Sequence, residues 1–275
     1  MSSALVLGGG GVAGIGWEAG LITGLKAAGV DLTEADLIVG TSAGSVVGTV
    51  IAQNADLTEL VDRVAVAEQA ATGVQVDMDK VMTAFAIMYD RTLDRAEAKR
   101  RVGALALEIT GGGERLAQIA ERLPSQEWPE RPLLITAVDT ATGELRVWDA
   151  ASGAGLAEAV SSSCCVPCVF PPVTIGGRRY MDGGVHSISN ADLAKGADRV
   201  VVIEPMAHLT PRSVLKRELE ALGEARIATI GPDAAAVEVF GVDVLDPSLW
   251  RPAFAAGLAQ APAVAADVAA AWSDS

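Results

Sequence analysis

The sequence has few aromatic residues, histidines and cysteines. Of its 275 residues, 4% are aromatic, two are histidines and three are cysteines. The cysteines are odd in number and lie together at Cys164, Cys165 and Cys168, which excludes a secreted disulfide framework. Cys165-x-x-Cys168 resembles half of a redox or zinc motif, but the chain has no second pair. We therefore expect small buried thiols and no metal.

Cations are also scarce. Lysine and arginine total 21 against 35 acidic residues, which gives a net charge of −14. Such a charge repels the phosphate backbone of nucleic acids and the surface of anionic bilayers. Basic residues gather only in short groups, such as Lys99–Arg101 and Arg178–Arg179. We therefore expect no nucleic-acid partner and at most transient membrane contact.

Long hydrophobic runs of the kind that cross a membrane are missing. Residues 1–17 carry no charge, but a signal peptide would begin with basic residues, and the apolar run Ala4–Leu7 ends at glycines. Residues 37–55 and 159–177 also lack charge, yet serine, glycine or proline interrupts both. The alanine-rich end, Ala253–Trp272, is expected to be a helix packed on the sheet. We expect no transmembrane segment and a soluble, cytoplasmic protein.

Half of the residues are apolar, and short apolar runs alternate with helical stretches. This alternation predicts an α/β fold whose mainly parallel sheet is covered on both faces. No repeat or polar linker divides the chain, so we expect a single domain over residues 1–275. Residues 56–122 are expected to be mostly helical, with breaks at Gly73 and Gly111–Gly113, and are a candidate lid. Strands are predicted at 4–7, 37–39, 133–138, 145–148, 179–181, 200–203 and 226–230, and further helices at 15–28, 43–53, 213–222 and the C-terminal end.

Gly40-Thr41-Ser42-Ala43-Gly44 matches G-x-S-x-G between a predicted strand and a predicted helix. This motif places a nucleophilic serine on a sharp turn, where small neighbours allow the backbone to fold tightly. At the start of a helix, Ser42 would also gain from the positive end of the helix dipole. The motif therefore predicts a catalytic serine at Ser42, with Gly40 and Gly44 shaping the elbow. The alternative is an ordinary turn in which Ser42 caps the helix.

Four consecutive glycines, Gly8–Gly11, follow the first predicted strand. Gly9-x-Gly11-x-x-Gly14 matches a dinucleotide-binding fingerprint, but that fingerprint needs an acidic residue at the end of the second strand, where this chain has the serine motif. The other interpretation is an oxyanion hole, in which uncovered backbone N–H groups bind a developing negative charge. We favour the oxyanion hole and predict Gly9, Gly10 and Gly11 as its donors.

A serine nucleophile requires a base, and the sequence leaves two kinds open. The histidines, His186 and His208, both follow Asp182, so a Ser-Asp-His order is possible. However, the α/β-hydrolase fold places several strands before its serine, whereas Ser42 follows only one β-α unit. The alternative base is a carboxylate, and Asp182-Gly183-Gly184 follows a short predicted strand. A carboxylate in contact with Ser42 could take its proton directly.

Taken together, these motifs resemble the patatin-like phospholipases. The resemblance rests on the glycine-rich run Leu5–Gly14, then Gly40–Gly44, then Asp182-Gly183-Gly184, 140 residues after Ser42. The segments Ala159–Pro167 and Phe170–Pro172 are similar to the family's segment before its aspartate. Residues 4–205 carry the resemblance, and residues 206–275 are expected to form a helical and strand extension.

The resemblance implies a three-layer α/β/α fold and a Ser42–Asp182 dyad without histidine. The dyad would cleave lipid or related acyl esters through an acyl-enzyme, with no cofactor and no metal. One departure is Ala13, at a position where the family usually has arginine or lysine. Arg178 or Arg179 could supply the missing cation. The remaining alternatives are a Ser-His-Asp esterase of another fold and a non-catalytic module that binds a nucleotide or an acyl group at its glycine loop.

Overall fold

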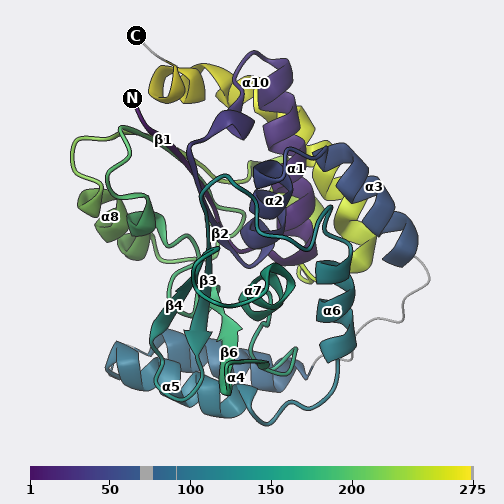
Figure 1. Cartoon of the computed structure of the whole chain (residues 1–275), viewed down its shortest axis with the longest axis vertical. Helices are drawn as coiled ribbons and strands as arrows, with labels where there is room; N and C mark the ends of the chain where they lie inside the picture. The colour runs from purple at the N-terminus through teal and green to yellow at the C-terminus, as the bar shows by residue number, and fades with distance from the viewer. Residues whose placement is uncertain (69–76, 91, 274–275) are drawn as a thin grey trace.

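The protein is built on one eight-stranded sheet (Figure 1). The computed structural model describes residues 1–68, 77–90 and 92–273. The strands follow the order β5-β6-β3-β2-β1-β7-β8, and β4 also pairs with β3. Their bounds are β1 Ser3–Leu7, β2 Leu37–Thr41, β3 Leu133–Asp139, β4 Leu145–Trp148, β5 Val173–Ile175, β6 Arg178–Asp182, β7 Arg199–Ile203 and β8 Arg226–Ile230.

The sheet is mainly parallel, as the sequence predicts. Strands β3, β2, β1, β7 and β8 run in the same direction. Strands β4 and β6 both pair with β3 in the antiparallel sense, and β5 and β6 form an antiparallel hairpin. The hairpin turn is formed by Gly176 and Gly177, both with positive φ. Strands β1 and β2 carry few polar residues because both faces of the sheet are buried there.

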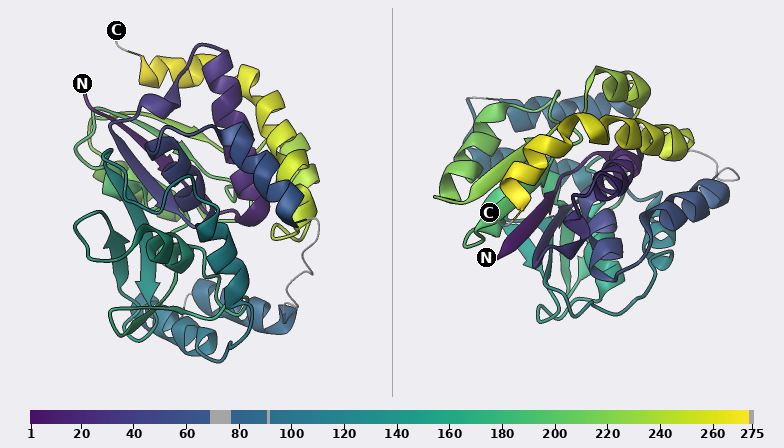
Figure 2. Two further views of the ribbon diagram at one scale, coloured as in Figure 1. Left: turned by 45° about the vertical axis from the view of Figure 1, so that its right-hand side comes forward. Right: turned by 90° about the horizontal axis from the view of Figure 1, so that it is seen from above.

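Helices cover both faces of the sheet and complete three layers (Figures 1 and 2). Leu5 and Leu7 of β1 pack with α1, α2 and α10, whereas Ala4 and Val6 face α8 on the other side. The predicted three-layer α/β/α fold is therefore confirmed. The helices are α1 Gly11–Ala27, α2 Ala43–Ala52, α3 Leu57–Glu68, α4 Met78–Tyr89, α5 Arg95–Ala106, α6 Gly113–Glu121, α7 Leu156–Ser163, α8 Arg212–Ala221, α9 Ala234–Phe240 and α10 Trp250–Trp272.

Helices α1 and α10 lie side by side, although they come from opposite ends of the described chain (Figure 2). Gly16, Gly20 and Gly24 recur every four residues along α1 and face α10. A Cβ at Gly20 would strike the backbone carbonyl of Phe254, so the two helices can approach this closely only with glycine there. These three glycines therefore form a surface of α1 against which α10 packs closely.

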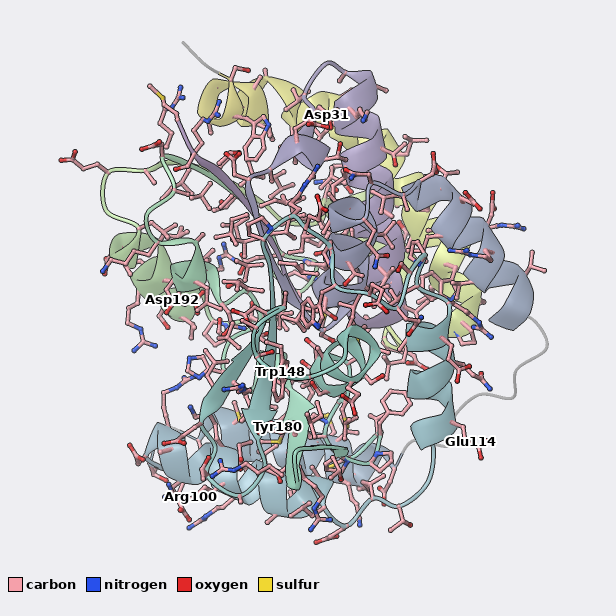
Figure 3. The ribbon with its side chains drawn as sticks, in the orientation of Figure 1. Asp31, Arg100, Glu114, Trp148, Tyr180 and Asp192 are labelled. Carbon is pink, nitrogen blue, oxygen red and sulfur yellow. The ribbon has the colours of Figure 1, made fainter. Side chains whose placement is uncertain are left out.

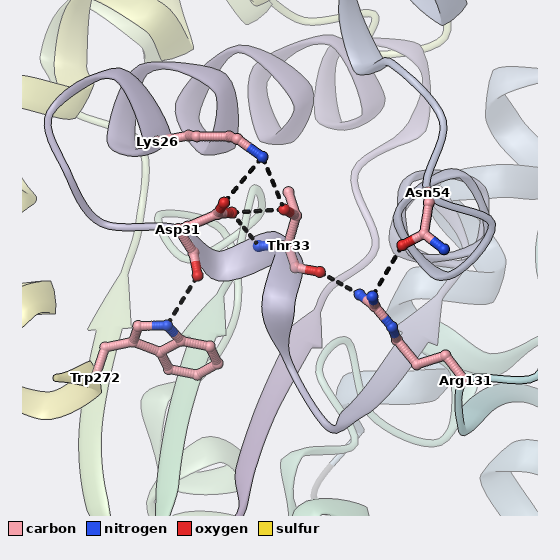
Figure 4. Close-up of polar contacts among 6 residues, drawn as sticks. All are labelled: Lys26, Asp31, Thr33, Asn54, Arg131 and Trp272. Atoms are coloured by element: carbon pink, nitrogen blue, oxygen red, sulfur yellow. Dashed lines mark hydrogen bonds and ion pairs between the residues drawn. The ribbon is translucent and has the colours of Figure 1, made fainter. Parts of the chain in front are cut away.

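Polar contacts also join the two ends of the chain. Gln260 of α10 accepts a hydrogen bond from Trp17 Nε1 at 3.0 Å and donates one to the carbonyl of Gly231 at 2.8 Å. Trp272 at the end of α10 donates its indole N–H to the carbonyl of Asp31 at 3.0 Å, next to the ion pair of Asp31 with Lys26 (Figure 4). The C-terminal helix is thus fixed to the N-terminal third of the protein at several points.

By length and composition, one described helical segment, Pro247–Trp272, could cross a membrane. In this structure the segment packs against α1, with residues such as Trp250, Ala253 and Trp272 buried. The helix therefore packs mainly on α1 and also contacts β7 and β8 of the sheet, while most of its residues stay partly or fully exposed.

Glu18 is an acidic residue in the core of the protein. It lies on the part of α1 that follows the glycine loop and is completely buried. Burial raises the pKa of its carboxyl group well above the ordinary value, which favours the uncharged form.

Two differences from the predicted elements bear on the site. Helix α1 begins at Gly11 instead of Ile15, so the glycine loop is short and leads directly into the helix. Helix α7 was not expected, because it ends in a run of serines, which gives no helical pattern. Residues 56–122 are largely helical as predicted, but Gly73 lies outside the described residues. A lid role for this region stays a prediction.

Candidate active site

The geometry of the sheet brings Ser42 and Asp182 together. Strand β2 pairs with β3 up to Thr41, which lies opposite Thr136. Strand β6 approaches along the same edge of β3 from the other direction and ends with Asp182 opposite Ala137. Because Thr136 and Ala137 are consecutive, the ends of β2 and β6 meet. The sheet therefore places the serine after β2 next to the aspartate at the end of β6.

Ser42 occupies a sharp turn between β2 and α2. Its φ of 53° and ψ of −117° lie in a region that residues other than glycine rarely adopt. The turn also requires close backbone contacts, because a Cβ at Gly44 would strike the backbone of Leu7, and the N–H of Gly44 donates to the carbonyl of Gly8 at 3.0 Å. A Cβ at Gly40 would lie 2.6 Å from the carbonyl oxygen of Gly44. The predicted strand–turn–helix context of the serine motif is thus present.

The glycine loop lies against this turn. A Cβ at Gly9 would be 3.4 Å from Cβ of Ser42 and 2.8 Å from Cδ1 of Ile188. The N–H of Gly9 donates to the carbonyl of Ile188 at 2.9 Å and is therefore not available to an oxyanion. This bond corrects the prediction that Gly9 is one of the oxyanion donors, and the reason is a backbone contact 179 positions away in the sequence.

Three other N–H groups beside Ser42 remain uncommitted. Within the described chain, Gly10, Gly11 and Ala43 have no acceptor for their backbone N–H. Gly10 and Gly11 stand at the start of α1, and Ala43 stands at the start of α2. The first N–H groups of a helix lack partners within the helix and lie at the positive end of its dipole, so they suit a negative charge. Ala43 was not among the predicted donors, although it directly follows the serine of the motif.

Asp182 is the charged group of the site, and it is 5% exposed. Burial raises the pKa of its carboxyl group to about 6, against the lowering effect of the nearby Ser42 side chain and of the hydrogen bond from the N–H of Gly184. The Gly184 bond is 2.7 Å long. The carboxyl group therefore lies near the Ser42 side chain, and its raised pKa suits proton exchange near neutral pH.

Both histidines are engaged elsewhere. The ring of His208 lies 6.3 Å from that of Phe240, and Nδ1 of His186 lies 3.3 Å from Nζ of Lys99. Burial and the neighbouring Lys99 lower the pKa of His186 to about 4. Among the described residues, neither imidazole hydrogen-bonds to Ser42. This arrangement gives no support to the Ser-His-Asp alternative.

The three thiols are free, and those of Cys164 and Cys165 lie next to the site. Burial raises the pKa of Cys164 to about 12 and also raises that of Cys165, with a further contribution from the charge of Asp182. Such thiols are unreactive, as expected of buried cysteines. In the described part of the chain, no three histidine, cysteine, aspartate or glutamate residues are grouped in a way that could hold a metal ion.

A buried polar network beneath the site was missed by the sequence analysis. Oγ1 of Thr41 lies 2.8 Å from Oγ1 of Thr136, and the Asn190 amide donates to Thr41 at 3.0 Å. Asn190 is fully buried and has a φ of 52°, in the left-handed region. The network supports the residue before Ser42. Nothing in the sequence indicates that these two threonines meet across neighbouring strands. Asn190 could have been chosen as a candidate site residue, because it follows Asp182 closely in the sequence.

A family model, patatin-like phospholipase, matches residues 5–195 of this chain. The chain belongs to the patatin-like phospholipase family. No curated protein sequence matches it. Among solved structures, it is similar to VipD from Legionella pneumophila, with 14% identity and a TM-score of 0.49 over 97% of this chain and 67% of that one. It is also similar to the type III effector protein ExoU, with 16% identity and a TM-score of 0.35 over 94% of this chain and 53% of that one.

The position where patatin-like sequences usually carry a cation is buried here. Ala13 is fully buried, and its N–H donates to the carbonyl of Val244 at 3.0 Å. The neighbouring Leu245 packs over the glycine loop, since its Cδ2 would be 2.9 Å from a Cβ at Gly11. Val244 and Leu245 both lie beyond residues 5–195, the part that matches the family model. The C-terminal extension therefore covers the loop where other members present a charge.

Arg178 does not replace this cation at the site. It lies at the start of β6 and forms an ion pair with Asp139 at 3.1 Å. Its side chain is largely exposed, so it is a solvated charge near the hairpin. The glycine loop of this patatin-like protein is thus bounded mainly by apolar residues.

Proposed function

We propose that this patatin-like protein is a serine acyl hydrolase that cleaves lipid or related acyl esters. Ser42 is the nucleophile and Asp182 is the base of a two-residue dyad. The observation that carries the proposal is the register of β2 and β6 on β3, which places Ser42 next to the buried Asp182 carboxyl group. The strained backbone of Ser42 adds support, because such strain persists mainly at functional sites.

The reaction would proceed in two steps. Oγ of Ser42 attacks the ester carbonyl while its proton passes to Asp182, and the oxyanion accepts hydrogen bonds from the N–H groups of Gly10, Gly11 and Ala43. When the ester bond breaks, Asp182 returns the proton to the departing alcohol, which leaves an acyl-serine. Water then attacks the acyl-serine, Asp182 takes a proton from the water, and that proton restores the Ser42 hydroxyl as the fatty acid leaves. The loss of one oxyanion donor is expected to lower the rate by about 100-fold or more.

The substrate class is proposed at the level of uncharged or weakly charged acyl esters. Ala13 provides no cation at the glycine loop, and Leu245 adds an apolar surface there. The net charge of −14 opposes firm adsorption to anionic bilayers. Dispersed or monomeric esters are therefore favoured over phospholipids in an anionic membrane.

A fluorophosphonate probe tests the proposal. We expect labelling of the folded wild type at Ser42, no labelling of Ser42→Ala, and labelling of Asp182→Asn slowed by about 100-fold to 10,000-fold. Circular dichroism would establish that each variant is folded. A folded wild type that is not labelled at Ser42 would exclude both enzymatic alternatives and favour a binding module. Hydrolysis of short-chain esters, lysophospholipid, phospholipid and acyl thioester would then define the substrate.

A further inference from the structure

The end of helix α7 contacts both members of the proposed dyad. The N–H of Ser42 donates to Oγ of Ser163 at 2.8 Å. The thiol of Cys164 donates to the carbonyl of Ser42 at 3.3 Å. The next residue, Cys165, accepts a hydrogen bond at its carbonyl from the N–H of Asp182 at 2.9 Å. Three consecutive residues thus hydrogen-bond to the backbone N–H and carbonyl of Ser42 and to the backbone N–H of Asp182.

These contacts occur where the backbone needs support. Ser42 has a positive φ, and a non-glycine residue keeps such a conformation only when its surroundings enforce it. Ser163 is fully buried, so its hydroxyl is the partner of an N–H group that water cannot reach. The carbonyl of Ser42 also accepts from the hydroxyl of Ser45 at 2.7 Å. The bond from Ser163 is the one that fixes the N–H side of the strained peptide.

We propose that Ser163 is a positioning residue for the reaction, which it supports by holding Ser42 in its strained conformation at a set distance from Asp182. This inference rests on the proposed function, because it assumes that Ser42 is the nucleophile. The effect would be on geometry, since displacement of reacting atoms by about 1 Å can lower a rate by about 100-fold. Cys164 would contribute less, because a thiol is a weak donor.

A matched control lies one residue away. Ser162 is also fully buried, but its hydroxyl accepts from Nε1 of Trp148 at 3.0 Å and donates to the carbonyl of Ala159 at 2.8 Å. Trp148 of β4 makes an edge-to-face contact with Tyr180 of β6, with ring centroids 4.9 Å apart (Figure 3). Removing the Ser162 hydroxyl therefore disturbs helix packing without touching Ser42.

The experiment compares Ser163→Ala with Ser162→Ala. For each folded variant, fluorophosphonate labelling of Ser42 and the kcat and KM for a soluble short-chain ester would be measured, together with unfolding in urea. We expect Ser163→Ala to lower the labelling rate and kcat by about 10-fold to 100-fold with little change in KM. We expect Ser162→Ala to keep both rates within about threefold of the wild type, whatever its stability. Ser163→Thr, which keeps the hydroxyl, should recover part of the loss.

Equal rates for folded Ser163→Ala and Ser162→Ala, in a wild type that is labelled at Ser42, would overturn this inference and leave the proposed function intact. A folded wild type without labelling would overturn both. If Ser163→Ala does not fold, Cys164→Ala replaces it in the comparison, with an expected loss of about twofold to fivefold. A labelling rate for Cys164→Ala equal to that of Ser162→Ala would then count against the inference.

Discussion

Asp182 is expected to reduce the stability of the fold while it serves the reaction. Burial raises the pKa of its carboxyl group from 3.8 to about 6, so the folded protein holds the proton more tightly than the unfolded chain. A difference of roughly two pH units corresponds to about 3 kcal/mol. The wild type therefore loses this amount of stability as the pH rises from about 4 to above 6, and loses no more at higher pH.

Asp182→Asn removes this cost, because the amide carries no charge at any pH. Its oxygen can still accept from the N–H of Gly184, whereas its NH₂ group needs a partner of its own. We expect the variant to be about 1–3 kcal/mol more stable than the wild type at pH 8 and nearly equal to it at pH 4. Activity should fall in the same variant, so stability and rate would change in opposite directions.

Unfolding in urea at pH 4 and pH 8 measures both differences. Asp233→Asn is a suitable control, because Asp233 is an exposed cap of α9 and asparagine caps a helix about equally well. This control should change stability by less than about 0.5 kcal/mol at either pH. A gain for Asp182→Asn that is the same at both pH values, or a loss at pH 8, would refute the reasoning.

Four other outcomes are expected. The fluorophosphonate labelling rate should fall about tenfold per pH unit below pH 6, because protonated Asp182 cannot accept the serine proton, and a flat profile from pH 4.5 to 8 would contradict this. His208→Ala should keep the ester hydrolysis rate within about twofold, whereas a large loss would favour a histidine base. Gly20→Ala should cost about 1–3 kcal/mol in urea unfolding, because its Cβ would strike α10, whereas Gly111→Ala has open space and should be nearly neutral. Glu18→Gln should raise the melting temperature more at pH 8 than at pH 4.5, because burial raises the pKa of Glu18 and its ionisation opposes folding as the pH rises; equal changes would count against this.

The parts of the site that are formed by residues close together in the sequence could be predicted. The strand before Ser42 and the helix after it follow from a short apolar run, a G-x-S-x-G motif and a second apolar run. The short loop before α1 follows from Gly8–Gly11 in the same way. Only the start of α1 differs, because consecutive glycines give no periodic pattern from which a helix boundary can be predicted.

The parts that depend on distant contacts could not be derived from local patterns. Ser42 and Asp182 meet because β2 and β6 end at consecutive positions on one edge of β3, and this register depends on pairing across the whole sheet. The commitment of the Gly9 N–H to Ile188 likewise has no local signature. The family resemblance supplied the pairing of serine and aspartate, but not the N–H groups that remain open beside them.

Helix α7 shows a different limit of sequence reasoning. Its serines and small residues give weak helical periodicity, and serine competes with the backbone for hydrogen bonds, so nothing predicted a helix there. Yet this helix brings Ser163 to the backbone of Ser42. Small polar residues without a pattern can therefore carry the contacts that orient a reactive group.

The pairing of α1 with α10 has a consequence for the order of folding. The first turn of α1 presents the N–H groups of Gly10 and Gly11, while its later turns are held by a helix more than 200 residues further along the chain. Contacts between segments so distant in the sequence form slowly. During synthesis, Ser42, Asp182 and the glycine loop would all emerge before α10, the helix that packs against α1. A chain that ends at residue 240 is therefore expected to carry both dyad residues but to show little fluorophosphonate labelling, and full labelling would show that the loop is set without α10.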